Sequence, residues 1–382
     1  MQSRLKIKGV YNRQIRNLID YKGVKMQKIK HMVCRYWRIV PVLVLLSCSN
    51  QGGVSQQPNS QSITTKKIYG SELHSAFTDI AYYKGTYYVV FREATAHVLG
   101  TDGKIVVLAS EDGETWEPYG VLEKSGIDLR DPKLSVTPDD RLMIIMGGTT
   151  FEGDKVVAMH THVSFLDGVD AEFSRPKPID LDPGVPYKQF WVWRVTWHEG
   201  VGYAICFPPQ QEGVTDLYLV KTTDGVVYER VSKLPASNFP NESTIRFDSD
   251  GRMNVLIRTD AGDRFGYFAT SKHPFNDWHL DKLGIRLGGP NFLYLPNGKI
   301  CVGSRAFEFK DETRTSLARV YTALFTFDER MNVEKEISLP SNGDTSYTGM
   351  LIVGNELWVS YFSQHEENTA IYLSKVPLSF FD

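Results

Sequence analysis

Residues 250–258 read DGRMNVLIR, a tight Asp-Gly turn that runs directly into a strand of alternating apolar residues. Five more stretches have this form, and they begin at Lys84, Asp139, Glu199, Asn297 and Gly354. The copies recur roughly every 50 to 60 residues, a period typical of propellers, in which each repeat forms one blade. The sequence therefore predicts an all-β fold, a six-bladed β-propeller whose blades are four-stranded antiparallel sheets.

The last repeat is one strand short of a complete blade. Its third predicted strand lies at residues 370–376, and the chain then ends. Residues 65–69, near the start of the repeat region, form an additional strand that can supply the missing edge. Such closure removes the exposed sheet edges of an open array. We expect the propeller to span residues 64–382 and to be closed by this N-terminal strand.

Composition limits the classes of function. The chain has 382 residues, 42% of them hydrophobic and 12% aromatic, which fits one large all-β domain. A net charge of −2 argues against a nucleic-acid partner, which usually requires a basic surface. Cys206 and Cys301 fall in the apolar register of repeated strands, so both are expected to be buried thiols. We find no Cys/His spacing typical of a metal site, and we expect a monomer without a metal or cofactor.

The first 48 residues differ from the rest of the chain. They are basic and lead into residues 39–48, IVPVLVLLSC, an apolar stretch too short to span a membrane. This segment resembles the lipobox of bacterial lipoproteins, which implies cleavage before Cys48 and lipidation of its thiol. An ordinary signal peptide is the alternative, and the long basic extension also fits a start at Met26 or Met32. Residues 49–63 are rich in Ser, Gln and Asn, as in a flexible tether. We expect a protein of the bacterial cell envelope, in the periplasm or at the outer-membrane surface, attached to the membrane only through its lipid.

In a propeller, the loops that enter the first strands and leave the second strands meet at one end of the central channel. Charged, aromatic and amide side chains dominate these loops. We predict a binding site at this end, and the alternative is a rim of mutually satisfied salt bridges. The candidates are Asp79, Arg92, Glu93, His97, Arg130, Asp131, Trp191, Arg194, Glu242, Arg258, Asn291, Arg305 and Tyr347.

Three segments of the last three repeats resemble the sialidase family. Residues 241–245, NESTI, followed by Arg258, resemble the sialidase segment that carries a catalytic Glu and a substrate-binding Arg. Residues 289–291 with Arg305 resemble the next Arg-bearing blade, and residues 344–347, DTSY, resemble the segment that presents a tyrosine nucleophile. The resemblance covers the whole repeat region, weakly in the second and third repeats.

A turn in the first repeat adds to the resemblance. Residues 110–116, SEDGETW, resemble the Asp-box turn of BNR repeats, in which Asp caps backbone amides and Gly takes a positive φ. Degenerate copies lie at residues 222–228 and 271–278. The turn lies on the outer rim of a propeller, so we interpret it as structural.

The resemblance implies an exo-acting glycoside hydrolase that cleaves a terminal sugar, acidic sugars included. Tyr347 would be the nucleophile and Glu242 its base, because a phenol with a pKa near 10 is a poor nucleophile until its proton is removed. Arg258 and Arg305 would clamp a substrate carboxylate, and an aspartate would protonate the leaving group. The alternatives are a non-catalytic glycan-binding lipoprotein and a scaffold propeller with a protein partner.

The sequence departs from the family in the first repeat. Sialidases carry a Phe/Tyr-Arg-Ile-Pro motif there, whereas residues 75–79 read SAFTD and lack the arginine. Arg92 and Arg130 are candidates to replace it. The leaving-group acid is also open, because Asp79, Asp102 and Asp131 all lie near this end, and Asp102 fits a hairpin turn equally well.

The remaining candidates are assigned to substrate binding. His97 leaves the second strand of the first repeat at the mouth, and it serves either in acid–base chemistry or in packing. Trp191 and Trp193 alternate in one strand, so only one of them faces the channel, where it would stack on a sugar ring. Glu93, Arg194 and Asn291 complete the set.

Overall fold

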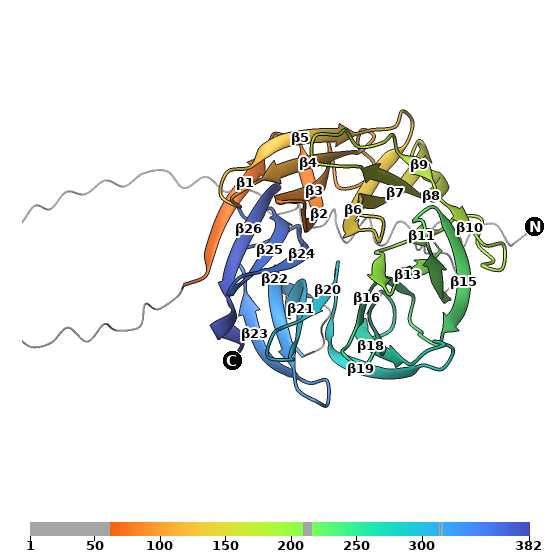
Figure 1. Ribbon diagram of the computed structural model, residues 1–382. Coiled ribbons are helices and arrows are strands. Elements are labelled where there is room, and N and C mark those ends of the chain that lie inside the picture. The colour runs from red at the N-terminus through yellow and green to blue at the C-terminus, as the bar shows by residue number, and fades with distance from the viewer. Residues whose placement is uncertain (1–61, 209–215, 313, 315) are drawn as a thin grey trace, which may run out of the picture. The chain divides into compact units, whose positions relative to one another are not determined.

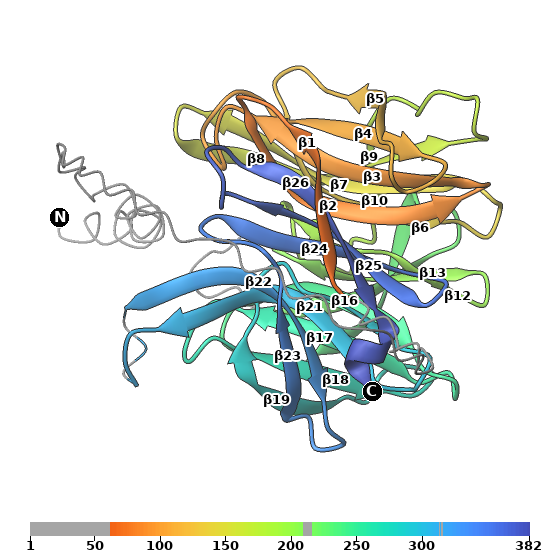
Figure 2. The same ribbon diagram turned by 90° about the vertical axis from the view of Figure 1, so that its left-hand side faces the viewer.

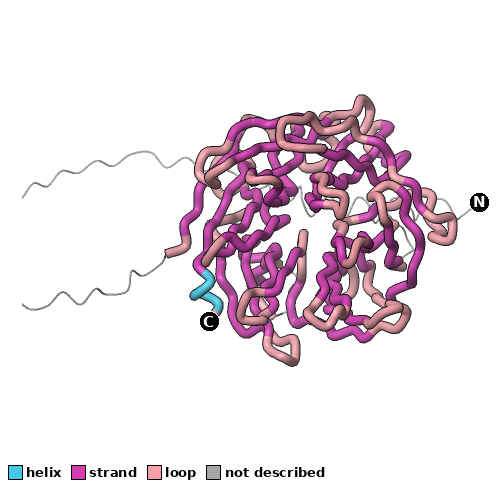
Figure 3. The backbone as a smooth tube through the Cα atoms, viewed as in Figure 1, coloured by secondary structure: helices cyan, strands magenta, loops and turns pink. Residues whose placement is uncertain are grey.

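The computed structural model describes residues 62–208, 216–312, 314 and 316–382. The predicted signal peptide, Cys48 and all of the predicted tether but its last two residues lie outside this part of the chain. The described residues form a ring of six sheets around a central axis, antiparallel except for one short pairing in the third (Figure 1), which confirms the six-bladed β-propeller. Strands and loops make up nearly all of the ring (Figure 3).

Blades 1 to 3 are formed by consecutive strands, beginning with β2, the second strand of the chain. Blade 1 contains β2 (His74–Tyr83), β3 (Thr86–Ala94), β4 (Lys104–Ser110) and β5 (Glu117–Leu122). Blade 2 contains β6 (Asp128–Val136), β7 (Leu142–Glu152), β8 (Lys155–Leu166) and β9 (Lys177–Pro178). Blade 3 contains β10 (Asp180–Leu181), β11 (Trp191–Val192), β12 (Thr196–His198), β13 (Val201–Phe207), β14 (Leu217–Thr222) and β15 (Val227–Leu234).

The last three blades repeat the pattern. Blade 4 contains β16 (Pro240–Phe247), β17 (Met253–Thr259), β18 (Phe265–Ser271) and β19 (His279–Arg286). Blade 5 contains β20 (Asn291–Tyr294), β21 (Ile300–Phe309), β22 (Leu317–Phe327) and β23 (Val333–Ser338). Blade 6 contains β24 (Thr345–Val353), β25 (Glu356–Ser363), β26 (Ala370–Pro377) and β1 (Thr64–Gly70).

Closure of the ring follows the sequence prediction. β1 pairs antiparallel with β26, from Thr64 opposite Lys375 to Gly70 opposite Ala370. A short 3-10 turn, η2 (Leu378–Phe381), then ends the chain next to β23 (Figure 2), where Lys335 Nζ donates to the Phe380 carbonyl. Within the described residues, no helix is both long and apolar enough to cross a membrane.

Blade 3 departs from the expected four-stranded form. Its inner strand is split into β11 and β12, and β10 adds a short parallel pairing to β15 at the outer edge. Residues 193–195 leave the regular ladder between β11 and β12. Arg194, in this break, turns toward blade 1 and pairs with Asp79 there.

The blades pack face to face, and this explains the apolar alternation of the repeated strands. On β3, Val89 and Phe91 join one core cluster, whereas Tyr88 and Val90 join another. Successive side chains of a strand point to opposite faces, so each sheet buries apolar residues on both sides. Cys206 and Cys301 are buried and free, as predicted.

The inner strands of four blades contain a β-bulge. The bulges follow Ala76 in β2, Arg130 in β6, Pro240 in β16 and Ser346 in β24. A bulge adds a residue to one strand and redirects its side chains, and bulges are common beside active sites. These four contain Phe77, Asp131, Glu242 and Tyr347.

The outer turn predicted at residues 110–116 has the expected hydrogen bonds. Asp112 Oδ1 accepts from the amides of Glu114 at 2.7 Å and Thr115 at 2.8 Å, and Gly113 has a φ of 69°. Asp224 caps two amides in the same way in blade 3. These turns belong to the rim and carry no site residue.

Candidate active site

Tyr347 and Glu242, on separate blades, are joined by a hydrogen bond. Tyr347 Oη donates to Glu242 Oε1 at 2.6 Å. The Gly289 amide donates to the other carboxylate oxygen, Oε2, at 3.0 Å. A Cβ at Gly289 would lie 2.5 Å from the Tyr347 ring, so this position accommodates only glycine without a shift. Strands β16 and β24 and the loop around Gly289 thus fix the positions of Glu242 and Tyr347.

Two arginines complete this centre. Arg258 Nη1 lies 2.6 Å from Glu242 Oε2 and 3.4 Å from Tyr347 Oη. The Arg305 guanidinium carbon lies 5.8 Å from the centroid of the Tyr347 ring, and its Nε donates to the Thr345 carbonyl at 2.8 Å. Both arginine side chains are 16% exposed, so part of each remains accessible to solvent.

The electrostatics of the centre keep the Tyr347 phenol neutral. Burial, and then the negative charge of Glu242, raise the pKa of Tyr347 well above its usual value, while Arg258 opposes this shift. An isolated phenol in this position would not ionise near neutral pH. The direct hydrogen bond to a carboxylate provides the route by which its proton can leave.

Among the acidic candidates, Asp131 has the environment that best suits a proton donor. Burial raises the pKa of Asp131, and the charges of Arg130 and Lys133 oppose that shift only in part. Arg130 Nε lies 3.2 Å from Asp131 Oδ2. The other oxygen, Oδ1, is buried without a hydrogen-bond partner among the described residues. A raised pKa keeps a carboxyl group protonated to a higher pH, which is the property that a general acid needs.

The other two acidic candidates have structural partners. Asp79 Oδ2 accepts from the Leu134 amide at 2.8 Å and from Arg194 Nη1 at 2.6 Å, and the residue is 1% exposed. Asp102 is exposed, and its Oδ2 accepts from the Gly126 amide at 2.9 Å. These contacts favour Asp131 over Asp79 as the acid, and they make Arg194 the buried partner of Asp79 instead of a substrate contact.

Arg92 and Glu93, in β3 of blade 1, are held by partners in blades 1, 2 and 6. Arg92 is fully buried, and its Nε donates to Asp128 Oδ1 at 2.8 Å. The Glu93 carboxylate accepts from Tyr69 at 2.7 Å and contacts Lys104 at 3.1 Å. We therefore withdraw both from the set of substrate-binding candidates.

Arg130 is the better substitute for the missing first-blade arginine. Its guanidinium carbon lies 5.2 Å from the centroid of the Phe77 ring, and the Phe77 and Tyr347 ring centroids are 4.8 Å apart. The Arg130 side chain is 11% exposed. Phe77 thus occupies the first-blade bulge and packs on the nucleophile candidate, and Arg130 lies over it.

The two tryptophans and Asn291 have different environments. Trp193 is 2% exposed, and its ring centroid lies 6.1 Å from that of Tyr347. Trp191 is half-buried and stacks on Phe207. Asn291 is buried and bonds Arg246 and the Thr348 carbonyl, which makes it a structural link between blades 4, 5 and 6.

Sequence reasoning placed Lys133 in the loop that carries Asp131 but assigned it no role. Its Nζ lies 5.6 Å from the Tyr347 ring centroid and 4.9 Å from that of Trp193, and the residue is 2% exposed. Burial, and then the charge of Arg194, lower the pKa of Lys133 to about 8. Apart from its place in the loop that carries Asp131, nothing in the sequence signals that this lysine is buried beneath the site.

A second missed group lies at the same end of the channel. His97 Nδ1 is 2.6 Å and His74 Nε2 is 2.9 Å from the same oxygen, Asp344 Oδ2. Asp344 Oδ1 lies 3.5 Å from Arg305 Nη2. Burial alone would raise the pKa of Asp344, but His97, His74 and Arg305 hold it well below its usual range. His97 is therefore paired, and its partners were not predicted.

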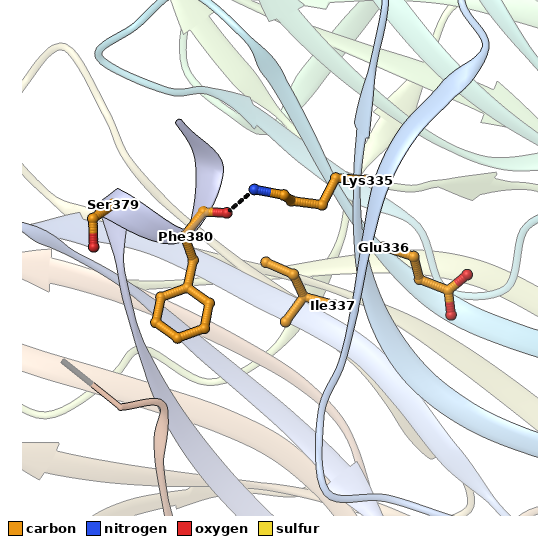
Figure 4. A pocket seen from close by; sticks show the side chains of 5 residues that line it. All are labelled: Lys335, Glu336, Ile337, Ser379 and Phe380. Atoms are coloured by element: carbon orange, nitrogen blue, oxygen red, sulfur yellow. Dashed lines mark hydrogen bonds between the residues drawn. The ribbon is translucent and has the colours of Figure 1, made fainter. Parts of the chain in front are cut away.

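A surface hollow lies elsewhere, on the outermost strand of blade 5. Lys335, Glu336 and Ile337 of β23 line it together with Ser379 and Phe380 of η2 (Figure 4). It contains none of the candidate site residues, which come from inner strands and the loops beside them.

Comparisons with known proteins agree with this fold. No protein-family model matches the sequence, and no curated protein matches it. A Dyadobacter fermentans protein of unknown function superposes with a TM-score of 0.70 at 16% identity, covering 82% of this chain and 98% of that one. Trypanosoma rangeli sialidase gives 0.63 at 11% identity, covering 83% of this chain and 60% of its own. The microbial sialidase Hz136 superposes with a TM-score of 0.60 at 12% identity, covering 80% of this chain and 66% of that one.

These likenesses define the class of fold. The chain has a sialidase-like six-bladed propeller, and it spans about 60% of the length of the trypanosomal enzyme. At such identities the comparison establishes the architecture and leaves the chemistry to the residues of the site.

Proposed function

We propose that this protein is an exo-acting glycoside hydrolase with sialidase-like chemistry, which removes a terminal sugar from a glycan. The observation that carries the proposal is the 2.6 Å hydrogen bond from Tyr347 to Glu242, with Arg258 on the opposite carboxylate oxygen. A buried phenol that donates a hydrogen bond directly to a base has the arrangement of an activated nucleophile.

The reaction would proceed in two displacements. Tyr347 Oη transfers its proton to Glu242 and forms a bond to the anomeric carbon, while the leaving-group oxygen departs with a proton from Asp131. Water then gives a proton to the Asp131 carboxylate and its oxygen to the anomeric carbon. Tyr347 leaves and regains its proton from Glu242, so both carboxyl groups return to their starting state.

Acidic sugars fit the hydrogen-bond donors around this centre. Arg258 Nε is a buried donor without a hydrogen-bond partner among the described residues, and Arg305 Nη2 has only a long ion pair, at 3.5 Å, with Asp344 Oδ1. Buried donors are normally satisfied, so a bound carboxylate would complete their bonding. Arg130, over Phe77, is placed to act as a third cation. This supports a substrate that carries a carboxylate next to its anomeric carbon.

A second candidate function is glycan binding without hydrolysis. The observation that favours it is Phe77, which fills the first-blade bulge in the segment where sialidases place an arginine. In either case we propose a monomer at the bacterial cell envelope, attached through a lipid on Cys48, with a glycan as its partner.

The test is a hydrolysis screen of the purified full chain on aryl glycosides, sialosides and uronides. Tyr347→Phe and Glu242→Gln are compared with Tyr82→Phe, which changes a half-exposed tyrosine outside the site. Hydrolysis by the parent and by Tyr82→Phe, but not by the two site variants, supports the proposal. Sugar binding by calorimetry without turnover supports the second candidate. Full activity in either site variant refutes the assigned roles.

A further inference from the structure

We propose that His74, His97 and Asp344 form a binding site for a divalent transition-metal ion at the mouth of the propeller. The inference does not depend on the proposed hydrolysis. It rests on three side chains that the fold brings together from distant parts of the chain.

The three side chains converge on one point. His74 begins β2, His97 follows β3, and Asp344 precedes β24, so blades 1 and 6 both contribute. Their ligand atoms all lie within 4.8 Å of one another. Both imidazole nitrogens point at Asp344 Oδ2, at 2.9 and 2.6 Å. These are hydrogen-bond distances, whereas ligand atoms around one tetrahedral ion, at bonds of roughly 2.0–2.2 Å, lie about 3.3–3.6 Å apart, so the side chains would move apart by under about 1 Å to admit an ion.

The donor set selects a class of metal. Two imidazoles and one carboxylate suit Zn²⁺, Fe²⁺ or similar ions, whereas Ca²⁺ and Mg²⁺ prefer oxygen ligands. Three protein ligands leave at least one coordination position for water or another oxygen. The side chains are 14%, 25% and 16% exposed for His74, His97 and Asp344, so an ion can enter from solvent.

The neighbouring charges tune this site without blocking it. Arg305 Nη2 lies 3.5 Å from Asp344 Oδ1, the oxygen that does not face the imidazoles. Arg305 can therefore orient the carboxylate from the second coordination shell while Oδ2 binds the ion. Arg130 also lies near, because its Nη2 donates to the His97 carbonyl at 3.3 Å. Two guanidinium groups repel a cation, so we expect weaker binding than at a closed structural zinc site.

The experiment titrates the full chain, without an affinity tag and after chelator treatment, with ZnSO₄ in a calorimeter. One Zn²⁺ per chain is expected. Replacing one ligand, in His97→Ala or Asp344→Asn, should weaken binding by at least about tenfold, since second-shell changes alone cost about 10–100-fold. His279→Ala is the matched control, because that histidine is exposed and lies on the outer strand of blade 4.

A spectroscopic measurement separates this site from adventitious binding. Co²⁺ is added to the same proteins, and its visible absorption reports nitrogen and oxygen ligands. The absorption should appear in the parent and in His279→Ala and be lost in the double variant His74→Ala/His97→Ala. Circular dichroism checks that the double variant is folded. No stoichiometric Zn²⁺ binding in the parent, or unchanged binding in the folded double variant, would overturn the proposal.

Discussion

Tyr347 donates a 2.6 Å hydrogen bond to Glu242, although 105 residues separate them in the chain. Each residue lies in the bulge of an inner strand, in blade 6 and blade 4 respectively. Tyr347 also has a φ of 57°, in the left-handed region that is costly for an aromatic residue. Strain of this kind persists where the surrounding structure holds it, which is common at functional sites.

Gly289 should control the alignment of this pair. In Gly289→Ala the new Cβ would meet the Tyr347 ring and the backbone would keep a φ of 59°, so we expect loss of activity and about 1–3 kcal/mol less stability. Gly298→Ala is the control, because its φ of 84° carries similar strain while nothing lies within 4 Å. Urea denaturation and hydrolysis assays on both variants measure the difference. Equal effects at the two positions would show that the ring contact is unimportant.

Asp131 should act as the leaving-group acid. Its raised pKa keeps it protonated to a higher pH than an ordinary aspartate. The rate on substrates that need protonation should therefore fall as the pH rises through that pKa. Asp131→Asn should abolish this limb and lose at least about a hundredfold on poor leaving groups, in the usual range for general acid catalysis.

Aryl glycosides with acidic phenols provide the control for Asp131. Their leaving groups depart without a proton, so Asp131→Asn should retain most of its activity on them. The measurement is kcat/KM against the pKa of the leaving phenol. The same loss on every leaving group would assign Asp131 to positioning instead.

Lys133 should support the negative charge that develops on Tyr347. Its pKa of about 8 means that it is charged at pH 7 and loses the charge as the pH rises above about 8. We expect activity to decline over that range in the parent. Lys133→Met should remove this decline at high pH. It should also lower activity at pH 7 by about tenfold, the effect of raising the pKa of the Tyr347 phenol by about one unit. Lys221→Met, at an exposed position, is the control, and a profile of Lys133→Met identical to the parent's would contradict this role.

The Asp79–Arg194 pair should be structural. Both side chains are buried, and removal of one partner leaves the other charge uncompensated. Arg194→Met should therefore cost about 3–5 kcal/mol of unfolding free energy. The exposed pair of Lys221 and Glu229 offers the comparison, since its loss should have little effect on urea denaturation. Normal stability of Arg194→Met would restore Arg194 to the substrate-binding candidates.

The fold was predictable because its determinants are local. Each blade is marked in the sequence by a turn followed by a strand of alternating apolar residues. The closing strand could be predicted because the last repeat lacks one strand. The split inner strand of blade 3 was not predictable, because it accompanies the contact of Arg194 with Asp79 in another blade. No periodicity in residues 191–198 marks that break.

The site was predictable where residues occupy equivalent positions of successive repeats. Glu242, Arg258, Arg305 and Tyr347 could be found this way. The pairing of charges could not be predicted, because burial decides it. Arg92 is fully buried beside Asp128, whereas the Arg130 side chain stays 11% exposed although it pairs with both Asp128 and Asp131. The burial of Lys133 and the pairing of Asp344 with His74 and His97 were not predicted for the same reason.

The most direct test of the account is the side-by-side hydrolysis of the best substrate by the parent chain, Tyr347→Phe and Glu242→Gln. Folding of each is checked by circular dichroism. We expect both variants to fold normally and to lose at least about a thousandfold in kcat, because each removes one member of the nucleophile–base pair. Hydrolysis at the parent rate by either folded variant would contradict it.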